Sequence, residues 1–96
     1  MTIYGVTKVN SAGYRDGTES KTFLFLKQED QEEYAYKLYD EAFWDYDFDD
    51  PKIDEAGRIL LEKDEFLKEI KKYDPLYAVI QGFDSHIQIE LFQQEI

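Results

Sequence analysis

The sequence predicts an α+β domain, in which an antiparallel sheet of about four strands, built from two terminal hairpins, carries two or three helices on one face. Three observations lead to this prediction. Apolar and polar residues alternate near both ends of the chain, a helical periodicity fills the segment between them, and a length of 96 residues fits a single domain, 1–96. Strands at both ends with helices between them are typical of helices packed on one antiparallel sheet.

The N-terminal hairpin is predicted from residues 3–9 and 22–27. In the first segment alternate residues point to opposite faces, and the Asp16-Gly17 pair favours a hairpin turn because it tolerates positive φ. The second segment, TFLFLK, is apolar on both faces. We therefore expect it to be a central strand or to be covered by helices, with Leu24 and Leu26 in the core.

Residues 28–44 are predicted to form the principal helix. With an advance of about 100° per residue, an apolar stripe forms along it. This stripe consists of Tyr34, Ala35, Leu38, Tyr39, Ala42 and Phe43. The carboxylates of Glu29, Glu33 and Asp40 cluster on the opposite side. If the helix extends to Trp44, the indole falls among these carboxylates rather than on the stripe.

The segment that follows the helix alternates aromatic residues with aspartates from Trp44 to Asp49. If this segment is extended, one side is aromatic and the other is a row of carboxylates. Pro51 ends it, because the residue before a proline avoids helical geometry. Residues 53–61 could form either a helix or a strand, since Gly57 weakens a helix there.

A second helix over residues 64–73, capped by Asp64, and a hairpin of strands 76–81 and 86–93 complete the predicted fold. In the last strand apolar residues alternate with polar ones, which is typical of a half-buried strand with one face in water. We expect the two terminal hairpins to join one sheet. The residues predicted in the core include Leu24, Leu26, Leu38, Ile70, Ile80, Ile87 and Ile89.

The charge of the chain is concentrated in residues 29–55. This stretch holds twelve carboxylates against two lysines, Lys37 and Lys52, so it carries −10 of the net charge of −11. It also holds seven large aromatic residues. An acidic surface repels phosphates and anionic lipids, which works against direct binding of nucleic acid or of a membrane. It favours a basic protein partner and fast, salt-sensitive association.

We expect neither catalysis nor a cofactor or metal from this sequence. The chain has no cysteine, and its sole histidine, His86, lies on the polar face of a predicted strand without a motif around it. Residues 45–49 match the D-x-D-x-D start of a calcium loop. The template then requires glycine at Asp50 and glutamate at Ala56, so we expect no specific calcium site there.

In size, acidity and aromatic content, centred on EDQEEYAYKLYDEAFWDYDFDDP, the chain resembles the small acidic phage-encoded inhibitors of CRISPR and restriction enzymes that imitate DNA. This resemblance is one of composition. It implies that carboxylates replace phosphates in the basic groove of a nuclease or of a CRISPR or restriction effector. Aromatic side chains would stack on arginine or fill a pocket of that partner. The residues expected at the partner-binding surface are Glu29, Glu33, Tyr36, Asp40, Glu41, Trp44, Asp45, Tyr46, Asp47, Phe48, Asp49 and Asp50.

Other functions would use the same surface. An immunity-type protein that neutralises a basic nuclease toxin would present it without imitating nucleic acid, and a folded accessory domain of a phage or plasmid product would inhibit nothing. A solvated helix face and loop is a further alternative, although so much uncompensated charge destabilises a compact domain. The sequence shows no signal peptide and no apolar run of about 20 residues, so we expect a cytoplasmic protein, in the host cytosol if phage-encoded. A homodimer is compatible with these features.

Overall fold

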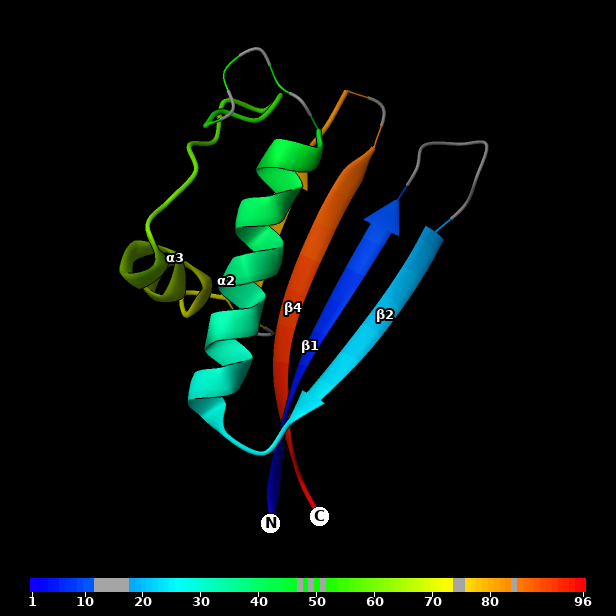
Figure 1. Ribbon diagram of the computed structural model, residues 1–96, viewed down its shortest axis with the longest axis vertical. Helices are drawn as coiled ribbons and strands as arrows, with labels where there is room; N and C mark the ends of the chain where they lie inside the picture. Colours follow the sequence, from blue (N-terminus) through cyan, green and yellow to red (C-terminus); the bar gives the residue numbers. More distant parts are fainter. Residues whose placement is uncertain (12–17, 47, 49, 51, 74–75, 84) are drawn as a thin grey trace.

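The computed structural model describes residues 1–11, 18–46, 48, 50, 52–73, 76–83 and 85–96. Within these residues the chain forms four strands and two helices (Figure 1). In chain order they are β1 (Thr2–Ser11), β2 (Thr18–Phe25), α2 (Gln28–Asp45), α3 (Lys63–Ile70), β3 (Leu76–Gln81) and β4 (His86–Glu95). The predicted α+β class, with a four-stranded antiparallel sheet and two helices, is therefore confirmed.

The two ends of the chain form the centre of the sheet. The strand order is β2-β1-β4-β3, and every neighbouring pair is antiparallel. The ends of the chain lie side by side (Figure 1), and the backbone N–H of Ile96 donates to the carbonyl of Met1 at 2.8 Å. The central pair of β1 and β4 thus joins the N-terminal and C-terminal hairpins into one sheet, as the sequence predicted.

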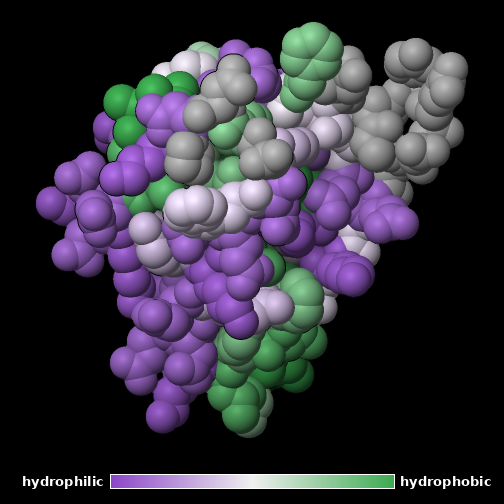
Figure 2. All heavy atoms as spheres, turned by 45° about the horizontal axis from the view of Figure 1, so that its top comes forward, coloured by the Kyte–Doolittle hydropathy of each residue, from purple (hydrophilic) through white to green (hydrophobic). Residues whose placement is uncertain are grey.

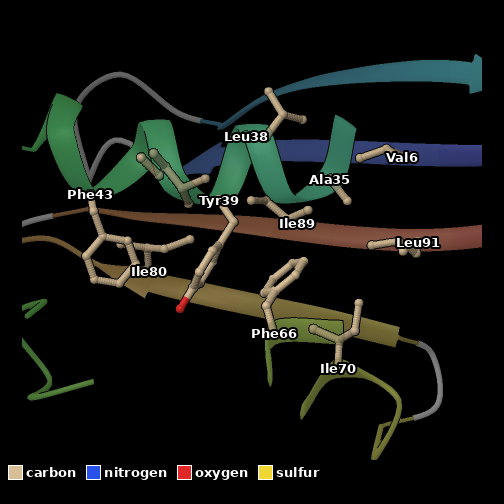
Figure 3. Packing of buried hydrophobic residues seen from close by; sticks show 12 residues of the cluster. Val6, Ala35, Leu38, Tyr39, Phe43, Phe66, Ile70, Ile80, Ile89 and Leu91 are labelled. Atoms are coloured by element: carbon tan, nitrogen blue, oxygen red, sulfur yellow. The ribbon is translucent and has the colours of Figure 1, made fainter. Parts of the chain in front are cut away.

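The core lies between one face of the sheet and the helices. Helix α2 lies over β1 and β4, and α3 lies towards β3 (Figure 1). The stacked rings of Tyr39 and Phe66, with centroids 4.3 Å apart, link the two helices. The buried hydrophobic cluster comprises Val6, Ala35, Leu38, Tyr39, Ala42, Phe43, Phe66, Ile70, Ile80, Ile87, Ile89 and Leu91 (Figure 3). The predicted core residues confirmed by this cluster are Leu38, Ile70, Ile80, Ile87 and Ile89.

The prediction for β2 is wrong in one respect, because Leu24 and Leu26 are exposed, by 63% and 68%. β2 is an edge strand, and alternate residues of a strand face opposite sides of the sheet. Phe23 and Phe25 face the helices, where their rings pack on Tyr34 with centroids 4.7 and 5.4 Å away. Leu24 lies on the other side of the sheet, which we call the open face because no described helix covers it.

Gly5 allows an aromatic ring to lie against the open face. In the sheet register Gly5 stands between Leu24 of β2 and Phe92 of β4. A Cβ atom at Gly5 would fall 2.1 Å from the Phe92 ring, so the ring occupies the space that any other side chain would need. The Phe92 ring covers the backbone of Gly5, which has no side chain of its own to cover it.

The ends of the helices differ from the prediction at three places. α3 ends at Ile70 rather than at residue 73. α2 continues through Asp45, so the alternating segment that starts at Trp44 is helical rather than extended at its beginning. α3 begins at Lys63, and its N-cap is Glu62 without a side-chain cap hydrogen bond, so the prediction of Asp64 as the cap is wrong. Asp64 lies in the first turn instead, where the helix dipole also favours a negative charge.

Residues 53–61, left open between helix and strand, form an irregular loop. An isolated bridge pairs Ile53 with Ile59. Gly57 adopts a φ of 79°, a conformation that residues with a side chain rarely adopt. The loop encloses one buried carboxylate, that of Asp54.

Candidate protein-binding surface on helix α2

The outward face of α2 carries carboxylates along its whole length. Lys37 is the only lysine in the helix, and its ammonium group lies 5.9 Å from the centre of the Tyr34 ring. All the acidic residues on this side are exposed except Asp40, which is half-buried. We call this surface the acidic face; its members are Glu29, Asp30, Glu33, Asp40, Glu41 and Asp45. Figure 2 shows a largely hydrophilic surface over the helices.

The acidic residues near the end of α2 work against the helix itself. The last turn holds no basic residue, while Glu41 and Asp45 place negative charge near the C-terminus, where the helix dipole is also negative. Helix stability accounts for Glu29 and Asp30, which lie in the first turn. It does not account for the carboxylates at the other end.

Trp44 projects from the acidic face. It is 60% exposed, and Asp40 and Glu41, four and three residues earlier, lie on the same side of the helix. The prediction that a helical Trp44 falls among carboxylates rather than on the apolar stripe is confirmed. A large aromatic ring in water does not contribute to the core, but it is suited to anchor an interface.

The other three aromatic residues predicted at this surface are half-buried and held within the protein. The Tyr36 hydroxyl donates to the carbonyl of Leu61 at 2.8 Å. The Tyr46 hydroxyl is 2.9 Å from Oγ of Ser85, and the Tyr46 ring stacks on Phe48 with centroids 5.3 Å apart. These contacts attach α2 to the neighbouring loops. Of the four aromatic residues predicted at the partner-binding surface, Trp44 is the one whose ring is strongly exposed.

Ion pairs to α3 flank the N-terminal half of the acidic face. The ammonium group of Lys63 donates to the Glu33 carboxylate, and that of Lys71 lies 3.6 Å from the Glu32 carboxylate. The hydrogen bond to Glu33 raises the pKa of Lys63. Such exposed pairs contribute little to stability, but they reduce the charge that Glu33 offers to a partner. Among the described residues, the half of the acidic face that lacks such a pair is the C-terminal half around Trp44.

Beyond α2, the structure describes only part of the predicted partner-binding surface. Asp50 is exposed, and its Oδ1 accepts a hydrogen bond from the backbone N–H of Lys52 at 3.0 Å. Asp47 and Asp49 lie outside the described residues, so their part in the surface stays a prediction. The described residues contain no group of three His, Cys, Asp or Glu side chains that could hold a metal ion. The expected absence of a calcium site at residues 45–50 also stays a prediction.

The role of Asp54 was not predicted from the sequence. Asp54 is 4% exposed, and its Oδ1 accepts from the backbone N–H groups of Ala56 and Arg58 at 3.0 and 2.8 Å. Its Oδ2 accepts from the N–H of Gln81 at 3.0 Å, which fixes the loop to β3. The spacing of Asp54 and Gly57 is typical of a turn in which aspartate bonds to later backbone groups, and this was the available clue.

Gln31 was also missed, and it orients α2 on the sheet. It is 5% exposed, and its Nε2 donates to the carbonyls of Gly5 and Phe92 at 2.9 and 2.8 Å. These two bonds fix the first turn of α2 to β1 and β4. The helix is thereby held with its apolar stripe on the sheet and its acidic face towards solvent.

A pocket of about 540 Å³ opens between α3, β3 and the loop that includes Arg58. Tyr39 lines it, and its hydroxyl donates to the carbonyl of Ile59 at 3.3 Å and accepts from the N–H of Leu61 at 2.9 Å. Burial raises the pKa of Tyr39 to about 12, so the hydroxyl stays protonated at neutral pH. The described residues that line the pocket include no serine, cysteine or histidine.

Comparison of the chain with protein-family models, with curated proteins and with solved structures found no match. In the part of the chain that the structure describes, no helix is long and apolar enough to cross a membrane. The geometry and charge of the acidic face therefore carry the functional interpretation.

Proposed function

We propose that this protein binds a basic nucleic-acid-binding protein and occupies its nucleic-acid groove, as an inhibitor of the anti-CRISPR or anti-restriction kind. The observation that carries the proposal is the C-terminal half of the acidic face, where carboxylates surround the exposed Trp44 against the preference of the helix dipole. The partner is a nuclease or a CRISPR or restriction effector. Its basic groove supplies the counter-charges that the helix lacks.

The mean charge density of the acidic face is comparable to that of a phosphate backbone. A helix rises about 1.5 Å per residue, so Glu29 and Asp45 are separated by about 24 Å along the axis. Its six carboxylates are unevenly placed, at separations from about 1.5 to about 10.5 Å along that axis, with a mean of about 5 Å, compared with about 3.4 Å between phosphates along one DNA strand. Arginine forks pair bidentately with carboxylates as they do with phosphates. A basic groove can therefore accept this helix face in place of a nucleic-acid strand.

Trp44 gives this surface a contact that charge alone does not provide. The carboxylates steer the encounter, because long-range attraction mainly raises the rate of association. The indole ring then stacks on an arginine or fills a pocket, which mainly slows dissociation. Asp40 and Glu41, on either side of the ring, pair with cations at the rim of that pocket.

The test starts with capture of the partner from a host lysate and elution with salt, followed by competition with the partner's own DNA or RNA. We expect the protein and the nucleic acid to exclude each other. Trp44→Ala should weaken binding by about 2 kcal/mol or more, mainly through faster dissociation. Glu41→Gln should mainly slow association and reduce its salt dependence. Ile59→Ala is the matched control, since Ile59 is 62% exposed but lies on the loop rather than on α2.

The outcomes separate the alternatives. If the partner binds its nucleic acid and this protein together without mutual weakening, mimicry is wrong. Binding that depends on Trp44 but leaves the nucleic-acid groove free would favour the immunity-type module. Equal effects of Trp44→Ala and Ile59→Ala would show that α2 is not the binding surface.

A further inference from the structure

The two edges of the sheet differ in how their backbone groups are satisfied. At the β3 edge, Gln81 donates its N–H to Oδ2 of Asp54 and accepts at its carbonyl from the N–H of Glu55, both at 3.0 Å. Arg58 donates from Nη1 to the carbonyl of Val79, also at 3.0 Å. At the β2 edge, none of the described residues bonds to the outward backbone groups. β2 therefore offers a free row of donors and acceptors to another strand.

β2 carries the charged residues Glu19 and Lys21, but it lacks other features that protect an edge strand. It pairs with β1 at eight consecutive positions without a bulge, and it contains no proline. Leu24 and Leu26 are exposed near its end. Figure 2 shows a hydrophobic area at the lower end of the molecule, where β2 leads into α2 and where both chain termini lie in Figure 1. An exposed edge that carries leucines is a site at which a second strand is expected to add.

We infer that β2 pairs antiparallel with β2 of a second copy of this chain, so that two four-stranded sheets become continuous. The charges of Glu19 in β2 and of Lys27, two residues after its end, are complementary in one register. With Phe23 opposite its own counterpart, Glu19 stands opposite Lys27 of the second copy, and the two-fold symmetry forms this pair twice. Lys27 is the N-cap of α2 and lies in the bend between β2 and the helix; its own φ of −123° and ψ of 137° are extended.

This self-matching order of charges favours a second copy over an unrelated extended segment. A two-fold antiparallel pair sets an edge against its own reverse, so an edge with Glu19 inside β2 and Lys27 two residues after the end of β2 is complementary to itself at these positions. The same register places the two Leu24 side chains diagonally across the open face, within reach of each other. The residues outside 29–55 carry a net charge of only −1, so the pairing edge belongs to the nearly neutral part of the chain.

Salt dependence distinguishes this dimer from binding of a basic partner. Each copy carries a net charge of −11, so two copies repel each other at low salt, and screening relieves that repulsion. We expect the dimer to strengthen as salt increases, whereas a complex with a basic partner weakens. The dimer does not depend on the proposed inhibitory function, and either can fail without the other.

The experiment is sedimentation velocity on the purified protein from about 10 μM to about 1 mM, at low and high salt. Lys27→Glu makes both cross-strand pairs repulsive, so the dimer should weaken about tenfold or more. Glu19→Lys should do the same, and an equimolar mixture of the two variants should restore association as a heterodimer. Lys52→Glu is the matched control, with the same change of charge away from the edge. Lys27→Glu should leave the fold intact, because a negative charge before a helix is favourable.

A monomer at every concentration and salt would overturn the inference. So would equal weakening by Lys27→Glu and Lys52→Glu, or a mixture of the two edge variants that fails to associate. A dimer that Trp44→Ala abolishes and Lys27→Glu leaves intact would place the interface on α2 and contradict the edge pairing. If the protein is monomeric but an extended peptide shifts the backbone amide resonances of β2, the edge binds another protein and the homodimer is wrong.

Discussion

The two faces of α2 serve opposite purposes. The buried face, with Leu38 and Phe43 almost fully covered, stabilises the fold through apolar contacts with the sheet and α3. The outward face leaves Trp44 in water and places Glu41 and Asp45 where the helix dipole disfavours them. Both faces belong to one helix of one length, so the difference lies in the side chains alone. A face that works against the stability of its own helix is the observation on which the proposed binding role rests.

Asp54 shows that charge alone does not define the acidic surface. It belongs to the same acidic stretch as Glu41 and Asp45, but it is buried and accepts three backbone hydrogen bonds. Asp54 contributes to the fold, because removing its carboxylate would leave backbone polar groups of the loop and of β3 without hydrogen-bond partners. Carboxylates of this stretch therefore divide into those that hold the fold and those that face solvent.

The largest effect is expected on the buried face. Leu38→Ala should reduce the free energy of unfolding by about 2–5 kcal/mol, because it leaves a cavity among well-packed neighbours. Leu38 is 5% exposed, so nearly all of its side chain is covered. Urea denaturation of this variant and of Glu41→Ala, on the opposite face, provides the comparison. A change within about 0.5 kcal/mol for Leu38→Ala, the size usual for surface sites, would show that the buried face is misassigned.

An intermediate effect is expected at Asp54. Asp54→Ala should cost about 2–3 kcal/mol, because backbone N–H groups that the carboxylate satisfies lose their partner. Asp50→Ala is the matched control, since Asp50 is exposed and accepts one backbone hydrogen bond, from Lys52. Denaturant unfolding gives the energies, and amide hydrogen exchange at Gln81 reports whether the β3 edge opens. Equal costs for the two variants would contradict the division between fold-holding and solvent-facing carboxylates.

The sequence predicted α2 well because the information lies within the helix. The apolar residues recur at helical spacing over the whole segment, so the buried face could be identified without knowing what packs on it. The same spacing placed Trp44 among carboxylates. The alternating strands of the C-terminal hairpin were predicted for the same reason, since Ile87 and Ile89 indicate one covered face.

Other features depend on contacts that are distant in sequence. Leu24 and Phe23 are both apolar, so the pattern of β2 does not show which side the helices cover. Asp54 acquires part of its role through its bond to Gln81, far along the chain, and no local pattern reveals that bond. Tyr46 and Trp44 alternate with aspartates as if they shared one side of a strand. Trp44 lies in the helix, however, and Tyr46 is the C-cap with helical backbone angles, so one ring lies within the protein and the other in water.

The smallest effect tests the outward face of α2 directly, through two identical changes at its two ends. Asp45→Asn should raise stability by about 0.3–1 kcal/mol at low salt, because it removes a negative charge from the negative end of the helix dipole. Asp30→Asn, in the first turn, should lower stability by a similar amount, since a carboxylate is favoured there. Both effects should shrink in high salt, because both residues are exposed and screening is strong at the surface. Thermal unfolding at two salt concentrations measures them.

If Asp45→Asn instead destabilises the protein, the C-terminal carboxylates contribute to folding, and the main reason for assigning them to a binding surface is lost. If it stabilises the protein and weakens partner binding, the same charge opposes folding and favours binding, as the comparison of the two faces requires.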